Sequence, residues 1–360
     1  ANTSRSSANY LQGAASTVSI LKGLDLTAFV SYRPFDATLN ESGTIRTILK
    51  TGYHRTVSEL NRKNNAHQFT SGGNLHWEAS GFHAGITAIY CHVDKSLQPQ
   101  TSQLYRLYYP SGSNFWNASL DYGYMNHRLS FTGETATGNN NGIATINSLS
   151  YLVSNNLSLI ALQRFYSKKY SSLFSSSFSE GGRIQNESGV YIGANWQALR
   201  HLSLMFYTDY SYFSQSRYQA SQSSYCWDNA ITATYTLPRW TLLGRYQYKV
   251  RQKDNKNKTA LINDETQRGR LSLAFSSSNW GLRLQGDAAY NSYKTTSFGW
   301  MTTLSGNYTV WHLHLAGTIG YFNTDDYSSR IYTYERGPLY SFTFPAFYGE
   351  GIRYEIVAFS

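Results

Sequence analysis

Positively charged residues recur at intervals of two and four along neighbouring alternating runs of the sequence. They are Arg245, Lys249 and Arg251 on one run, Arg268 and Arg270 on the next, and Arg283 on a third. Side chains at even spacing on a β-strand share a face, so these cations are predicted to form a basic wall. Such a wall would attract and orient anionic solutes.

Carboxylates occupy equivalent positions in runs earlier in the chain. They are Asp25, Glu78, Asp121 and Glu134. If the runs close into a cylinder, acids and cations face each other across the lumen, and the resulting transverse field orients polar solutes. The alternative is that the charges neutralise each other in a closed, plugged interior.

Catalysis is the other chemistry that these residue types allow. Nine histidines and many serines make chance Ser/His/Asp groupings unavoidable, so they do not indicate a triad. His312 and His314 would share one face, but no third metal ligand accompanies them. Neither a phosphate-binding glycine loop nor a CxxC pair is present. The sequence predicts no enzyme, metal or cofactor, and a barrel hydrolase is kept only as a third hypothesis.

Residues 231–250 show most completely the element that must carry these side chains. Ile231, Ala233 and Tyr235 alternate with threonines, and after a turn at 237–239 an apolar row from Trp240 to Val250 alternates with polar and basic residues. The second run is about ten residues long, which is the length a tilted strand needs to cross a bilayer. We interpret the segment as one hairpin of an outer-membrane β-barrel.

The composition favours the same class. Tyrosine (31) and phenylalanine (18) are abundant, and proline (6) is scarce. The sequence contains no run of about 18 apolar residues, which is the length that a membrane helix needs. The net charge of +10 favours lipopolysaccharide, lipid headgroups, nucleic acid or acidic solutes as partners, or else describes a solvated surface. The two cysteines, Cys91 and Cys226, fall on distant runs, so no disulfide is expected.

Connections between the runs alternate between two kinds. Tight turns are predicted at 22–23, 80–81, 126–127, 155–156, 197–200, 237–239, 277–279 and near 310. Longer segments are predicted at 34–71, 94–114, 167–187, 210–225, 251–266 and 323–338. Short periplasmic turns and long extracellular loops are typical of bacterial barrels. The fold class is therefore all-β: a transmembrane antiparallel up-and-down β-barrel, with roughly 16 to 20 strands when complete.

Tryptophan positions agree with a membrane location. Trp77, Trp196, Trp240, Trp280 and Trp311 lie near tight turns, whereas Trp116, Trp227 and Trp300 begin runs that return from long loops. Aromatic residues are enriched at the two membrane interfaces, so all of these residues are predicted to lie at one interface or the other.

Strand parity makes a prediction about the two ends. If the turn at 22–23 is periplasmic, a first strand at about residues 8–18 would start outside the cell, and a last run at 352–360, after a turn near 348–351, would finish outside it. A closed single-chain barrel normally starts and finishes in the periplasm. Residues 1–360 are accordingly predicted to be one barrel domain and an internal fragment of a longer chain.

Several loop segments resemble a known family. They are GYHRT at 52–56 with SEL at 58–60, YRLYYPSG at 105–112, GETA at 133–136 with IATIN at 143–147, residues 164–193 with FSEGGRIQNESGVYIG at 178–193, and DDYSSRIYTYE at 325–335 followed by FYGEGIRY. The chain resembles outer-membrane barrels of the Bacteroidota that follow an N-terminal helix-hairpin-helix domain. The resemblance implies an upstream domain through which nucleic acid could be bound.

The first long loop contains a capping-box sequence from Thr56 to Glu59, which predicts a short helix over about 57–63. Its cations Arg55, Arg62 and Lys63 would lie at the barrel mouth. The alternative is a folded loop that packs in the lumen as a constriction.

The predicted function is transport across the outer membrane of a Gram-negative bacterium, either as a channel or as a subunit of an envelope transport or secretion complex. The rival is a non-conducting barrel whose loops bind a partner protein, lipoprotein or nucleic acid. Outer-membrane lipid and lipopolysaccharide are expected partners in both cases.

Overall fold

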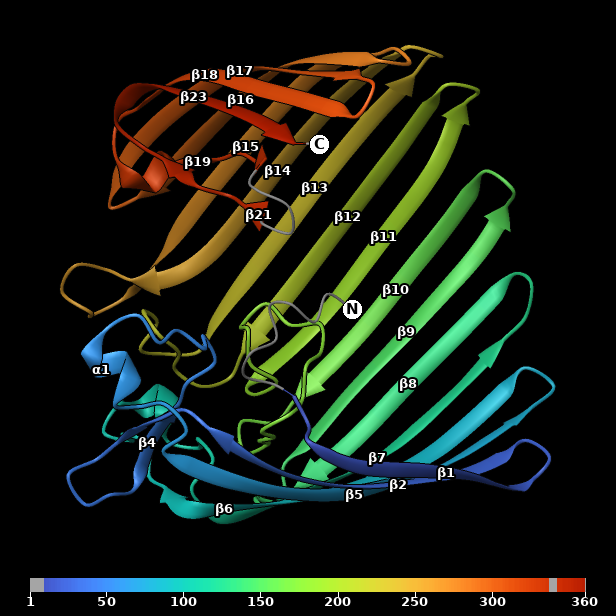
Figure 1. The fold of residues 1–360 in the computed structure, drawn as a ribbon, viewed down its shortest axis with the longest axis vertical. Helices are drawn as coiled ribbons and strands as arrows, with labels where there is room; N and C mark the ends of the chain where they lie inside the picture. The colour runs from blue at the N-terminus through green and yellow to red at the C-terminus, as the bar shows by residue number, and fades with distance from the viewer. Residues whose placement is uncertain (1–9, 337–341, 360) are drawn as a thin grey trace. The chain divides into compact units, whose positions relative to one another are not determined.

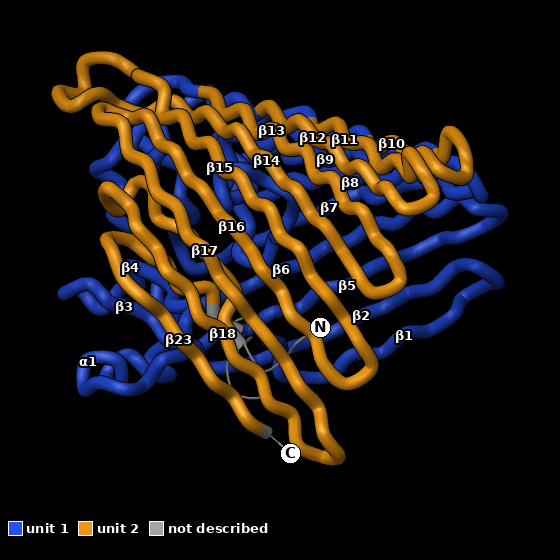
Figure 2. Tube along the Cα trace, turned by 90° about the horizontal axis from the view of Figure 1, so that it is seen from above, with its two compact units in different colours: residues 1–151, 161–190, 211–224 blue, residues 152–160, 191–210, 225–360 orange. Residues whose placement is uncertain are grey.

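The computed structural model describes residues 10–336 and 342–359, and nearly all of its regular structure is β-strand (Figure 1). The short helices are α1 (Val57–Leu60), η2 (Leu104–Arg106) and η3 (Tyr327–Ser329). None of the helices in these ranges is long and apolar enough to span a membrane. The chain divides into unit 1, residues 1–151, 161–190 and 211–224, and unit 2, residues 152–160, 191–210 and 225–360 (Figure 2).

Unit 1 is built from antiparallel strands that pair in chain order, apart from a small hairpin inserted after the second strand. The main strands are β1 (Gly13–Leu21), β2 (Leu24–Phe35), β5 (Ala66–Ala79), β6 (Phe82–Leu97), β7 (Gly112–Met125), β8 (Leu129–Gly138) and β9 (Ile143–Ser154). The inserted hairpin is β3 (Ala37–Leu39) with β4 (Ile45–Ile48), and β4 touches β6 through a parallel bridge between Ile45 and Leu97.

Unit 2 repeats this arrangement. Its main strands are β13 (Ser224–Thr236), β14 (Trp240–Asp254), β15 (Leu261–Ser276), β16 (Trp280–Tyr293), β17 (Thr295–Val310), β18 (Leu313–Thr324) and β23 (Glu350–Phe359). Between β18 and β23 lie the short β19 (Ile331–Tyr332), β20 (Glu335–Arg336), β21 (Phe342–Thr343) and β22 (Ala346–Phe347). Residues of β10 (Leu157–Tyr166), β11 (Glu187–Leu199) and β12 (Leu202–Phe213) are shared between the two units, as are the last residues of β9 and the first residue of β13.

Each main strand has one apolar and one polar face. In unit 2 the register places Leu284, Leu304 and Ile319 side by side on adjacent strands, and all of them remain exposed. The residues one position along, such as Gln285 and Thr303, are buried. A sheet that exposes its leucines and covers its polar residues is the reverse of a soluble sandwich and matches a surface solvated by lipid.

The predicted tight turns hold, except that the turn predicted at 197–200 lies at 200–201, because β11 continues to Leu199. The predicted loops 34–71, 94–114, 210–225 and 251–266 were too long, because the strands continue into them; β5 begins at Ala66, for example, and β14 continues to Asp254. The first strand, predicted at about 8–18, spans Gly13–Leu21. Of the predicted first strand, residues 8 and 9 lie outside the described residues, as do the last two residues of the predicted loop 323–338.

All eight tryptophans are at least 40% exposed, so none is packed in a core, and their location at a membrane interface stays a prediction. Trp311 is 95% exposed and lies in the β17–β18 turn itself with φ 52°. The predicted fold class, all-β with antiparallel up-and-down strands of membrane-crossing length, is confirmed.

Candidate functional site

The predicted basic wall is present on the polar face of β14, β15 and β16. The register pairs Arg245 with Arg270, Gln247 with Arg268, and Ala274 with Arg283, so all of these positions share one face. Lys249 and Arg251 lie further along the same face of β14, opposite Thr266 and Asp264. The structure therefore brings all six predicted cations together within unit 2.

Part of this wall is neutralised by acids that are not among the predicted site residues. Lys249 Nζ lies 2.9 Å from Asp228, Arg270 Nε lies 2.6 Å from Asp287, and Lys253 Nζ lies 2.7 Å from Asp264. Asp228 also accepts a hydrogen bond from Gln247 at 2.8 Å. Each of these acids occupies a polar position in the period-two alternation of its strand, directly opposite a cation of the wall. That alternation was a usable signal for finding them.

The described parts of the segment between β18 and β23 contact the same polar face. Ile331 and Phe347 are buried against Ala289 of β16 and Met301 of β17, whose side chains point to the polar side. This packing places Arg330 and Tyr332 against the basic wall, where Arg270 Nη2 donates to the Tyr332 carbonyl oxygen at 3.2 Å. From the sequence this segment is predicted to be an extracellular loop, and Arg330 is not among the predicted site residues.

Two adjoining cavities lie between this segment and the wall. The first, of about 240 Å³, is lined by Arg245, Arg268, Arg270, Asp287, Arg330 and Tyr332, among others. The second, of about 330 Å³, is lined by Lys249, Arg251, Lys253, Asp264, Asn291 and Arg330, among others. Gln247, Arg268 and Arg330 line both. Arg283 lines a separate cavity of about 290 Å³.

The four predicted acids lie in unit 1, and the register places each on the polar face. Asp121 pairs directly with Glu134, and Asp25 pairs with His76 and accepts a hydrogen bond from Ser19 at 2.6 Å. Glu78 pairs with His83 across β5 and β6. These acids therefore have polar neighbours of their own within unit 1, and the predicted transverse field remains a prediction.

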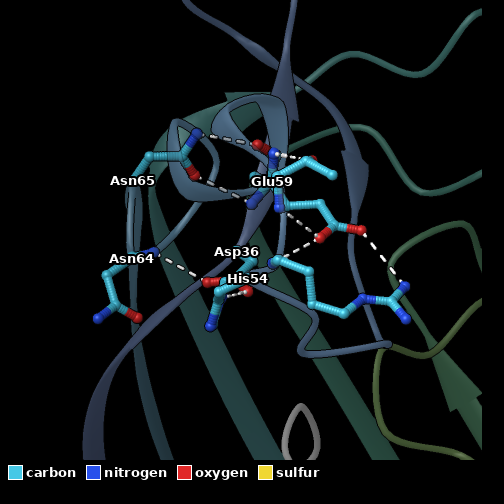
Figure 3. A network of polar contacts seen from close by, with 8 residues as sticks. Asp36, His54, Glu59, Asn64 and Asn65 are labelled. Carbon is cyan, nitrogen blue, oxygen red and sulfur yellow. Dashed lines mark hydrogen bonds and ion pairs between the residues drawn. The ribbon is translucent and has the colours of Figure 1, made fainter.

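The mouth loop contains the predicted capping box, but its helix is shorter than expected. Thr56 Oγ1 accepts from the Glu59 amide, and the Glu59 carboxylate accepts from the Arg55 and Thr56 amides (Figure 3). These backbone donors, Arg55 first, lower the pKa of Glu59. The helix ends at Leu60 rather than near residue 63, because Asn61 at the C-cap begins a turn.

The three mouth cations do not form a common site. Arg55 lies 4.0 Å from the Tyr53 ring centroid and 3.7 Å from Glu59, whereas Arg62 is half-buried and Lys63 is exposed. Asp36 holds this loop by contacts to His54 at 2.7 Å and to the Asn64 amide at 2.9 Å (Figure 3).

The β3–β4 hairpin before this helix packs on the polar side of unit 1. Ala37 and Ile45 are buried in a cluster with Cys91, Val93 and Phe115 of β6 and β7. Tyr90 and Trp116 point to the opposite, exposed face, so the cluster lies on the polar face. The hairpin buries Ala37 and Ile45 on the polar face, as the alternative prediction of a folded loop requires. The helix α1 has no buried residue, so that alternative stays a prediction for α1.

The loop sequences that carry the family resemblance have a structural role. Arg164 and Glu187 form a fully buried ion pair with Nε to Oε1 at 2.5 Å, and Arg164 Nη2 donates to Ser211 Oγ at 2.6 Å. The Glu187 carboxylate also accepts from the amides of Glu180 and Gly181. The Arg164–Glu187 pair thus joins three strands to the loop between β10 and β11.

Tyr170 and Gln185 complete this loop network in unit 1. Gln185 Nε2 donates to the carbonyl oxygens of Tyr108 and Lys168, each at 2.8 Å. Tyr170 packs beside Gly142, where a side chain would meet the Tyr170 backbone at 2.2 Å. Burial, with a smaller contribution from the Glu134 charge, raises the pKa of Tyr170 to about 12.

The DDYSSR segment is organised by Asp326. Its Oδ1 accepts from Ser297 Oγ at 2.7 Å and from the Ser328 amide at 2.6 Å, which lowers the pKa of Asp326. A lowered folded-state pKa contributes stability that is present above the unfolded pKa and lost as the pH falls through the folded value.

We expect amide exchange at Ser328 to accelerate as the pH is lowered below about 4, beyond the change of intrinsic rate. Hydrogen exchange with mass spectrometry on the peptide containing residues 325–332 measures this. Asp326→Asn should exchange rapidly at every pH and show no added acid dependence. An unchanged acid profile in the variant would contradict the assignment.

The predicted histidine pair is wrong as a shared face. His312 lies in the β17–β18 turn, and only His314 is in β18, where its Nδ1 lies 3.0 Å from Thr309 Oγ1. Within residues 10–336 and 342–359, no group of three His, Cys, Asp or Glu side chains is arranged to hold a metal ion.

No protein-family model matches the sequence, and no curated protein is significantly similar to it. Among solved structures, the outer-membrane channel DcaP of Acinetobacter baumannii is 11% identical, with 97% of this chain and 100% of that chain covered and a TM-score of 0.42. The anion-selective porin of Comamonas acidovorans is 10% identical, with coverages of 96% and 100% and a TM-score of 0.39. The FrpB iron transporter of Neisseria meningitidis is 8% identical, with coverages of 87% and 58% and a TM-score of 0.44.

Proposed function

We propose that the chain is a β-barrel of the outer membrane of a Gram-negative bacterium and serves as a transport channel or as the channel subunit of an envelope transport complex. One observation carries the proposal. Long antiparallel strands expose apolar rows bordered by tryptophan on one face and collect arginine and lysine on the other. Lipid would contact the first face, and the second would line a water-filled lumen.

The mechanism is passive diffusion along a charged wall. Unneutralised arginines on the polar face raise the local concentration of anions and lower that of cations. The segments folded onto the polar face, at 37–48 in unit 1 and around Ile331 and Phe347 in unit 2, would narrow the lumen and limit the size of the solute. Outer-membrane lipid and lipopolysaccharide would surround the barrel.

Planar-bilayer recording of the purified chain tests this function. We expect discrete conductance steps with preference for anions. Arg245→Glu combined with Arg283→Glu should lower the anion-to-cation permeability ratio several-fold, because both arginines are exposed on the polar face. Ser203→Glu, on a different strand, serves as a charge control. Bilayers that contain folded protein and stay silent would contradict the channel.

The second candidate is a sealed barrel whose loops bind a partner. The same folded segments favour it, because they bury apolar side chains on the face that a channel leaves open. Its binding surface would include the exposed Tyr53, Val57 and Leu60 of the mouth loop. Loss of co-purifying envelope proteins on Val57→Asp with Leu60→Asp, in a silent barrel, would support this candidate over the channel.

A further inference from the structure

We propose that Arg245, Arg268 and Arg330 form a binding site for the phosphate group of a small phosphorylated solute. The proposal rests on the proposed channel function, because it names the class of solute that the lumen would select. These arginines line the 240 Å³ cavity between β14, β15 and the segment that follows β18. Arg245 and Arg268 belong to the basic wall, whereas Arg330 comes from the segment that follows β18.

The charges around this cavity are unbalanced. It is lined by four arginines and by Asp287, and Asp287 is already paired with Arg270 at 2.6 Å. Arg245, Arg268 and Arg330 therefore remain in excess, and no ion pair joins any of them to a carboxylate within residues 10–336 and 342–359. Like charges held together repel, and an anion among them relieves that repulsion.

Neutral groups hold two of the arginines in place. Arg330 Nε donates to the Tyr332 hydroxyl at 2.6 Å, and Arg330 Nη1 donates to the Tyr327 carbonyl oxygen at 2.8 Å. The Arg268 guanidinium lies 5.6 Å from the Tyr332 ring centroid. These contacts orient the guanidinium groups without cancelling their charge, so the groups are arranged for an anion before it arrives.

The excess charge selects a phosphate over a single carboxylate. A phosphate monoester carries about −1.5 to −2 charges at pH 7 and offers three oxygens, whereas a carboxylate carries one charge. Planar guanidinium groups bind such oxygens in bidentate pairs. The adjoining 330 Å³ cavity shares Gln247, Arg268 and Arg330 and adds Thr266 and Asn291. Its polar lining suits the hydroxyl groups of an attached sugar.

A free solute fits better than a lipid headgroup. Both cavities lie on the polar face, whereas acyl chains would contact the opposite, apolar face of the same strands. A phospholipid could not place its phosphate in the cavity while its chains remained in the bilayer.

Calorimetric titration of the detergent-purified full chain with glucose 6-phosphate tests the site. We expect saturable binding that glucose at the same concentration does not show. Arg268→Gln and Arg330→Gln should each weaken binding by about ten-fold or more, because each removes a charge-assisted hydrogen bond. Arg283→Gln is the matched control: it removes one charge from the same face but from another cavity, and should change binding less than about two-fold.

Arg330→Lys separates charge from geometry, since it keeps the charge and loses the planar fork; intermediate binding is expected. Unchanged migration of unboiled samples shows that each variant is folded. Equal weakening by Arg283→Gln, absence of saturable binding, or binding of only short-chain phosphatidic acid would overturn the proposal. Saturable binding by a barrel that does not conduct would support the phosphate site and contradict the channel function. Conductance without saturable binding would support the channel function and contradict the phosphate site.

Discussion

Replacing Glu187 with methionine is expected to lower the free energy of unfolding by about 3 to 5 kcal/mol. Glu187 is 1% exposed and is an ion-pair partner of Arg164 at 2.5 Å, so the variant removes a buried carboxylate that faces this guanidinium. The amides of Glu180 and Gly181 lose their acceptor in the same step.

Urea unfolding of the chain in micelles measures this loss, and limited proteolysis of the loop at 167–186 reports its local part. The control is the double variant Arg164→Met with Glu187→Met, which removes both charges. It should recover much of the lost stability, because the main cost of the single variant is the charge pairing that the buried Arg164 loses. A double variant as unstable as the single one would mean that the hydrogen bonds, and not the charge, dominate.

Replacing Ile319 with arginine is expected to cost about 2 to 4 kcal/mol when the chain folds into lipid vesicles. Ile319 is 53% exposed and pairs with Leu304 and Tyr354 near the middle of β18, where hydrocarbon would surround it. A guanidinium at this depth must lose its hydration or distort the bilayer.

The neighbouring residue provides the matched control. Thr318→Arg introduces the same side chain on the polar face, opposite Glu355, and should change stability by less than about 1 kcal/mol. Folding yield in vesicles, followed by the change in electrophoretic migration, compares the two variants. Equal behaviour of the two would contradict lipid contact on the apolar face.

The strands and their faces were predictable because their signal is local. Alternation with a period of two assigns each side chain of a strand to one face. The sequence therefore predicts that Arg245 and Arg270 share a wall, and the register pairs them. Tight turns between strands are short and rich in polar residues, so their positions were also visible. Strand ends were less certain, since β14 and β15 continue past the predicted membrane edge to Asp254 and Leu261.

The site on the wall depended on contacts between distant segments. Nothing near Arg330 in the sequence indicates that Ile331 and Phe347 pack on Ala289 and Met301 and so carry the arginine to the wall. The prediction for the histidine pair was wrong because of the turn between β17 and β18. Residues 311 and 312 form this turn, with Trp311 at positive φ, so His312 is not part of β18.

By itself the sequence determined an antiparallel array of membrane-crossing strands, the face on which each charge lies, and the end at which each tryptophan lies. These features follow from the geometry of a single strand and its nearest turn. Only the tertiary structure decided which charges are neutralised, which loops fold onto the polar face, and which cavity they enclose. Those outcomes depend on packing between segments far apart in the chain, and periodicity along one strand contains no information about such packing.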